Sequence, residues 1–98
     1  MHDWVLNSIY FDWQSGTALL IFSTCINGNY VYVTLHCYNV TEFNIPKKEE
    51  WGPSVSVYGY RGPEKIDKKN NKLTIEMQTG DEIVLIAERF VCRELGLS

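Results

Sequence analysis

LTIEMQTGDEIVLIA, residues Leu73 to Ala87, contains the clearest structural signal in this chain. Apolar and polar residues alternate up to Gln78, and an apolar run resumes at Ile83 after the Thr79-Gly80-Asp81 break. Alternation with a period of two on both sides of a Gly-Asp break predicts a β-hairpin. We expect its apolar side chains to enter the core and its polar side chains to face solvent.

The rest of the chain contains several shorter strand patterns separated by turn residues. The first pattern, within His2–Trp13, changes face near Asn7-Ser8, which indicates a bulge. The run 17–24 is apolar almost throughout, so we expect it either to be covered on both faces or to lie centrally in the sheet. Asn27-Gly28 predicts a hairpin turn. Further strands are expected at 30–37, 40–45 and 54–60.

Two segments are harder to assign. Arg61–Lys72 contains Gly62-Pro63 and Asn70-Asn71, and is therefore predicted to be a loop. Glu88–Leu95 shows both helical spacing and the alternation that would continue the last strand. We favour a strand for 88–92 and keep the helix as the alternative.

Together these patterns predict one all-β domain covering residues 1–98. Turn signals recur at the spacing of sandwiches and barrels, and no segment longer than about 10 residues has strong helical periodicity. We expect a small antiparallel β-sandwich or a partly open barrel of about six to eight strands. One short helical turn after Pro53 is compatible with the sequence.

The composition is that of an ordinary globular protein. The chain has 98 residues, of which 45% are hydrophobic, and a net charge of −3. Three cysteines without a C-x-x-C pair, and an N-terminus without a signal-peptide pattern, favour reduced thiols and a cytoplasmic location. The cysteines lie in apolar runs, so we expect them to be buried and inert. No apolar run is long enough to span a membrane, and no membrane partner is expected.

No catalytic constellation or cofactor motif is recognisable. His36 and Cys37 are adjacent, so in a strand they point to opposite faces and cannot easily bind one metal ion. Arg61–Lys72 carries a net charge of +3 while the other residues sum to −6. This basic segment has no interleaved aromatic residues, which argues against nucleic-acid binding. We expect no catalytic residues, metal or cofactor.

Aromatic residues supply the candidates for a binding surface. Six Tyr and three Trp suit both strand packing and protein interfaces. The partner-binding candidates are Tyr30, Tyr32, His36, Tyr58 and Tyr60. A pocket between sheet and loops would use a different set, Trp13, Trp51, Glu76 and Asp81.

Several short motifs occur in order along most of the chain. They are His2-Asp3, Ile9 with Asp12-Trp13, Ile45-Pro46, Trp51-Gly52-Pro53-Ser54 with Val57, and Ile75–Asp81 (IEMQTGD). In these motifs the chain resembles a family of short, uncharacterised bacterial proteins, and in size and class it is loosely similar to immunity-type proteins of bacterial toxin systems. The resemblance implies no catalytic residues because no activity is assigned to that family.

We therefore expect a non-enzymatic interaction module that binds a protein partner. The first alternative is a small-molecule binding protein or enzyme with a pocket near Trp51, Glu76 and Asp81. The second is a homodimeric structural β domain.

Overall fold

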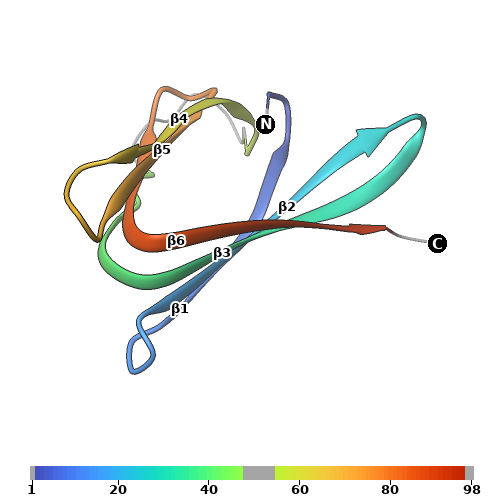
Figure 1. Cartoon of the computed structure of the whole chain (residues 1–98). Helices are drawn as coiled ribbons and strands as arrows, with labels where there is room; N and C mark the ends of the chain where they lie inside the picture. The colour runs from blue at the N-terminus through green and yellow to red at the C-terminus, as the bar shows by residue number, and fades with distance from the viewer. Residues whose placement is uncertain (1, 48–54, 97–98) are drawn as a thin grey trace.

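The computed structural model describes residues 2–47 and 55–96, and all regular structure in them is β (Figure 1). It contains six strands: β1 (Val5–Asp12), β2 (Thr17–Ile26), β3 (Asn29–Asn44), β4 (Val57–Lys65), β5 (Asn71–Met77) and β6 (Glu82–Gly96). The all-β prediction is confirmed. The described part of the chain contains no helix of the length and apolarity that crossing a bilayer requires.

The strands form one antiparallel sheet in the order β1-β2-β3-β6-β5-β4. Each half is a three-stranded meander, β1-β2-β3 and β4-β5-β6, and the halves are joined by the β3–β6 pair. This pairing brings residues from the middle and the end of the chain side by side. It makes the two longest strands the axis of the fold (Figure 1).

Both long strands bend where the two meanders meet. Asn39 has a φ of +55°, and the pairing register shifts between Val40 and Glu42. Asn tolerates this left-handed conformation better than most residues, and its side-chain amide donates to Glu88 Oε2 at 2.8 Å on the facing strand. The prediction of a separate strand at 40–45 is wrong because β3 continues through the bend to Asn44.

The core lies on the concave side of this bent sheet. Alternate residues of β2, β3, β5 and β6 contribute buried apolar side chains, and β4 contributes Val57. The largest are Phe22, Leu20, Ile75, Leu85 and Val57. Part-buried side chains of β1, Leu6 and Ile9, complete the packing. The alternation predicted for 30–37 and for the 73–87 hairpin is confirmed for the alternate aliphatic positions, such as Leu35, Ile75 and Leu85, which are buried. The expectation that the polar residues of the hairpin face solvent is wrong for Thr74, which is buried.

The two edges of the sheet touch at one corner, which we call the seam. The amides of Asp3 and Leu6 donate to the carbonyls of Val57 and Val55, and the Val57 amide donates to Trp4, at 2.7–2.9 Å. The remainder of β1 and β4 is not paired in this way, so the sheet stays open. A partly open barrel, one of the two expected architectures, describes this arrangement.

Most local predictions hold. The bulge lies between Leu6 and Ser8, Asn27 and Gly28 have positive φ in the β2–β3 turn, and β6 continues as a strand to Gly96. The loop predicted for 61–72 is wrong, because β4 extends to Lys65 and β5 begins at Asn71. The Gly-Pro signal marks a register shift within β4 and not its end.

Two predictions of burial need correction. Leu19 and Ile21 of β2 point away from the core and are only half-buried, so this strand is not covered on both faces. The alternative agrees with the structure, because β2 lies inside the sheet between β1 and β3. Of the three cysteines only Cys37 is buried, because Cys25 and Cys92 lie where β2 and β6 extend past the core.

Candidate functional site

The candidate binding surface lies on the convex side of the first meander, β1-β2-β3. We call it the outer face, made of the outward side chains of residues 8–12, β2, 30–38 and 89–93. Along β3, Tyr32, Thr34, His36 and Tyr38 alternate with the buried aliphatic positions. Tyr32 is 40% exposed and Tyr30 is 70% exposed. The β4–β5 hairpin lies on the opposite, core side of this half of the sheet (Figure 1).

Neighbouring side chains hold the middle of this face in place. The imidazole of His36 is hydrogen bonded through Nε2 to the Thr34 hydroxyl at 3.2 Å. It also lies parallel to the Tyr38 ring, with centroids 6.4 Å apart and an interplanar angle of 14°. The Arg89 guanidinium covers the same tyrosine, 4.4 Å from its centroid. Because these contacts already restrict the side chains, binding of a partner would cause a smaller loss of conformational entropy.

A shallow hollow of about 340 Å³ opens on β1, β2 and β3. Its lining includes outward-facing residues of all three strands, Tyr10, Leu19, His36 and Tyr38. An apolar floor with a few polar groups at the rim suits one anchoring side chain of a protein partner.

The charge of the outer face differs from that of the rest of the chain. It carries Arg89 and Arg93 against one carboxylate, Asp12, a net +1, whereas the other residues sum to −4. Asp12 caps the β1–β2 turn, where its Oδ1 accepts from the amides of Gln14 and Ser15 at 3.1 and 3.5 Å. The face is therefore a mildly basic patch on an acidic protein.

The structure divides the sequence-predicted partner residues into two groups. Tyr30, Tyr32 and His36 share the outer face of β3. Tyr58 and Tyr60 are exposed on β4, which is separated from β3 in the sheet by β6 and β5. Tyr58 instead adjoins the N-terminus, where His2 Nδ1 donates to its carbonyl at 2.6 Å and the two rings meet edge to face.

Sequence reasoning missed several members of the outer face, among them Tyr10, Tyr38, Arg89 and Arg93. The alternation that selected Tyr30, Tyr32 and His36 also reaches Tyr38, so this residue could have been found. Tyr10 and Arg89 join the face through strand pairing, which links Tyr10 to Leu19 and Arg89 to Tyr38. Such long-range registers leave no local signal in the sequence.

The candidate pocket residues do not assemble into one described site. Trp13 is 87% exposed in the β1–β2 turn. Glu76 and Asp81 lie beside the β5–β6 turn, next to the seam and hence at the opposite end of β1, roughly 26 Å away at about 3.3 Å per residue. Trp51 lies outside the described residues.

The two acidic candidates have structural partners. Glu76 accepts from Arg61 Nη1 at 2.6 Å, and the same guanidinium reaches Glu82 at 3.4 Å. Asp81 is buried in the turn, where its Oδ2 accepts from the Thr79 hydroxyl at 3.3 Å and its carbonyl accepts from the Met77 amide at 2.8 Å. These contacts fit roles in holding the hairpin.

Two of the recurring motifs meet at the seam. The Gln78 side-chain amide donates to Asp3 Oδ1 at 2.7 Å, and its backbone amide donates to the Ser56 carbonyl at 2.9 Å. The His2-Asp3 and Ile75–Asp81 motifs therefore join the first strand to the β5–β6 turn. The polar side chains of these two motifs therefore have a structural role at this corner.

Cys37 and Cys92 are poorly suited to act as nucleophiles. Burial raises the pKa of the Cys37 thiol to about 12, and partial desolvation raises the pKa of Cys92. Both thiols are protonated at neutral pH, whereas a thiolate is the nucleophilic form. Among residues 2–47 and 55–96, no three His, Cys, Asp or Glu side chains are grouped so that they could hold a metal ion.

Comparison with known proteins adds no further assignment. No protein-family model matches the sequence, and no similar protein was found among curated proteins or solved structures.

Proposed function

We propose that this chain is a non-enzymatic protein-binding module that holds its partner on the outer face. The observation that carries the proposal is the uncovered sheet face of tyrosines beside His36, Arg89 and Arg93. Tyr and Arg are enriched in protein interfaces and dominate their binding energy. A role like that of immunity or inhibitor proteins is compatible with such a surface, as the resemblance to short bacterial proteins suggests.

The contacts made by the acidic residues Glu76, Asp81 and Asp12 support a binding role over a catalytic one. Glu76 is neutralised by Arg61, and Asp81 accepts hydrogen bonds within its own turn. A general acid or base would need a carboxylate beside a space for substrate. The hollow on the outer face contains one carboxylate residue, Asp12, whose Oδ1 is occupied by two backbone amides.

Affinity capture from the native host, with the wild-type protein and two tyrosine variants as bait, tests the proposal. We expect Tyr32→Ala to weaken capture of the main partner by about 1 to 4 kcal/mol in binding free energy, the range for interface hot spots. Tyr58→Ala is the matched control, because Tyr58 is similarly exposed but lies on β4. Equal capture by the wild type and folded Tyr32→Ala would refute the outer face as the binding surface.

A homodimer is the other arrangement that an exposed sheet face could serve. Light scattering over a range of concentrations separates the two. A constant monomer mass, together with capture of a different protein, supports the proposal, whereas a mass that doubles and falls with Tyr32→Ala supports self-association.

A further inference from the structure

We propose that the free edge of β6, residues 89–94, binds an extended acidic segment of the protein partner by strand addition. This inference rests on the proposed function. It adds the backbone conformation and the charge pattern of the partner segment.

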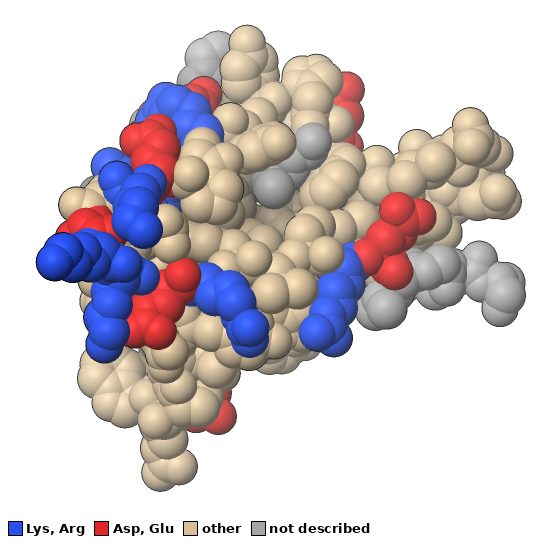
Figure 2. Space-filling view, viewed as in Figure 1, with Lys and Arg blue, Asp and Glu red and all other residues tan. Residues whose placement is uncertain are grey.

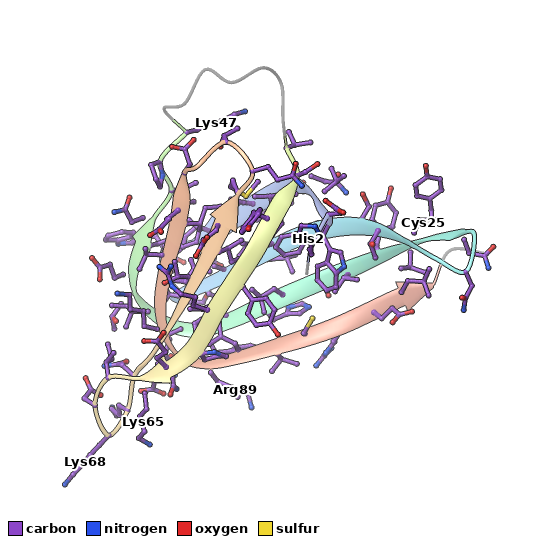
Figure 3. The ribbon with its side chains drawn as sticks, turned by 90° about the horizontal axis from the view of Figure 1, so that it is seen from above. His2, Cys25, Lys47, Lys65, Lys68 and Arg89 are labelled. Atoms are coloured by element: carbon purple, nitrogen blue, oxygen red, sulfur yellow. The ribbon has the colours of Figure 1, made fainter. Side chains whose placement is uncertain are left out.

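The edge exists because β6 extends beyond the region in which it pairs with β5. β6 pairs with β3 from Val84 to Gly96, but with β5 only as far as Ala87. The Asn71 side-chain amide donates to the Glu88 carbonyl at 3.0 Å and so satisfies the next position. From Arg89 onward, no described backbone group pairs with the second side of β6. Figure 3 shows this edge at the lower border of the sheet, with no strand beside it.

An unpaired strand edge presents backbone donors and acceptors in a regular order. In an antiparallel ladder, alternate residues direct both their amide and their carbonyl to the same neighbour. The segment 89–94 therefore offers about three such residues to an added strand. Strand addition of this kind supplies affinity through the backbone and specificity through the alternating side chains.

The side chains of this edge indicate an acidic partner. Arg89 and Arg93 point to the outer face with Val91 between them, and no ion pair joins either arginine to a described residue. Arg89 is held over Tyr38, and Figure 3 shows it at the free border of β6. Figure 2 shows further Lys and Arg side chains over the adjoining β4–β5 end of the molecule, where they are interspersed with Asp and Glu. Directly opposed side chains of paired strands lie close enough for ion pairs, so the complementary pattern is acidic, apolar, acidic at alternate positions.

A second copy of this chain fits the edge less well when it is paired about Val91, the residue between the two arginines. Two-fold antiparallel pairing centred on Val91 would place Arg89 of one copy opposite Arg93 of the other, and Glu88 opposite Glu94. Like charges in directly opposed positions destabilise a strand pair. Single-stranded nucleic acid could use the arginines and tyrosines but has no amide ladder to extend the sheet. The exposed edge and its charges together favour an acidic peptide strand.

Two fluorescent peptides that differ only in charge test the inference on the full chain. The probes are Thr-Glu-Thr-Val-Thr-Glu-Thr and the same sequence with Lys in place of Glu. We expect the acidic peptide to bind with a Kd below about 1 mM and the basic one to bind at least about ten-fold more weakly. NMR should show amides within 89–94 becoming protected from hydrogen exchange when the acidic peptide is bound.

Arg93→Glu should abolish the preference between the peptides, because Arg89 stays basic and each peptide then meets one opposite and one like charge. Lys47→Glu is the matched control, because it changes the net charge equally at an exposed position that Figure 3 shows on the opposite border of the molecule. The inference is overturned by equal affinity for both peptides, by no binding at about 1 mM, or by an Arg93→Glu effect no larger than that of the control.

The remaining outcomes separate this inference from the proposed function. Protection confined to 30–38 would refute the edge and leave the outer face as the binding surface. Failure of Tyr32→Ala to affect partner capture would refute the outer face, while the peptide data still report on the edge. Tighter binding of a single-stranded oligonucleotide than of the acidic peptide would overturn strand addition. So would a dimer that Arg93→Glu dissociates or strengthens.

Discussion

The seam and the outer face use similar polar and aromatic residues in opposite ways. At the seam, Asp3 and Gln78 bond to each other, and the backbone of Val57 is paired with that of residues 3 and 4. On the outer face, Tyr30, Tyr32 and Arg93 project from a well-paired sheet toward solvent. The polar residues of the seam bond to each other across the sheet and so help to explain the fold. We expect a partner to bind where exposed aromatic and basic residues do not join separate parts of the fold.

This contrast explains why the most distinctive short motifs of the sequence are poor guides to activity here. His2-Asp3 and Ile75–Asp81 contain the chain's most distinctive combination of acidic and amide side chains. In the structure these groups hold one corner of the sheet, together with the backbone hydrogen bonds of the seam. Their contacts therefore have a structural explanation.

The largest expected effect is on the core that both regions share. Ile75 is fully buried in β5, beneath the polar residues of the hairpin. Ile75→Ala should lower the free energy of unfolding by about 2 to 5 kcal/mol, because it removes buried methyl groups and leaves a cavity. Urea unfolding followed by tryptophan fluorescence measures the change. Ile66→Ala is the control, since Ile66 is 48% exposed and its loss should cost less than about 0.5 kcal/mol. Equal losses would show that β5 does not cover the core.

The same glycine substitution should affect the two halves of the molecule differently. Gly62 in β4 has a φ of +99°, and an added Cβ would lie 2.5 Å from the Lys72 carbonyl oxygen and 2.8 Å from the Glu64 amide. Gly28, in the turn that carries Tyr30, has a φ of +79° and open space around it. We expect Gly28→Ala to cost about 1 kcal/mol from its backbone conformation, and Gly62→Ala about 2 to 4 kcal/mol from conformation and steric conflict together.

Thermal or urea unfolding of both glycine variants measures these costs. A smaller loss for Gly62→Ala than for Gly28→Ala would contradict the close pairing of β4 with β5 at this register shift.

The sequence predicts the individual strands and their buried sides better than it predicts where strands bend, continue or meet. Alternation in 30–37 and 73–87 identified the strands and their buried sides because burial on one face imposes a period of two. The bend at Asn39 was missed, since one residue with positive φ lets a strand continue while its apolar pattern changes phase. The continuation of β4 past Gly62-Pro63 was missed because the same residues usually mark turns.

The candidate site was predicted in part for a similar reason. Tyr30, Tyr32 and His36 are neighbours along one strand, so alternation alone places them on a common face. The seam pairs residue 3 with 57, and Arg89 reaches Tyr38 across the β3–β6 pair. These contacts depend on strand order, which a single sequence does not encode in any local pattern.

The smallest expected changes in stability give the most direct test of the difference between the seam and the outer face. Gln78→Ala removes the hydrogen bond to Asp3 and should lower stability by about 0.5 to 1.5 kcal/mol, because it weakens the attachment of the first strand. Tyr32→Ala removes an exposed ring from a strand already paired on both sides and should change stability by no more than about 0.5 kcal/mol. Partner capture should show the reverse order, with Gln78→Ala retaining the partner and Tyr32→Ala losing it. If Tyr32→Ala is the more destabilising of the two, its ring serves packing, and the division between an architectural corner and a binding face fails.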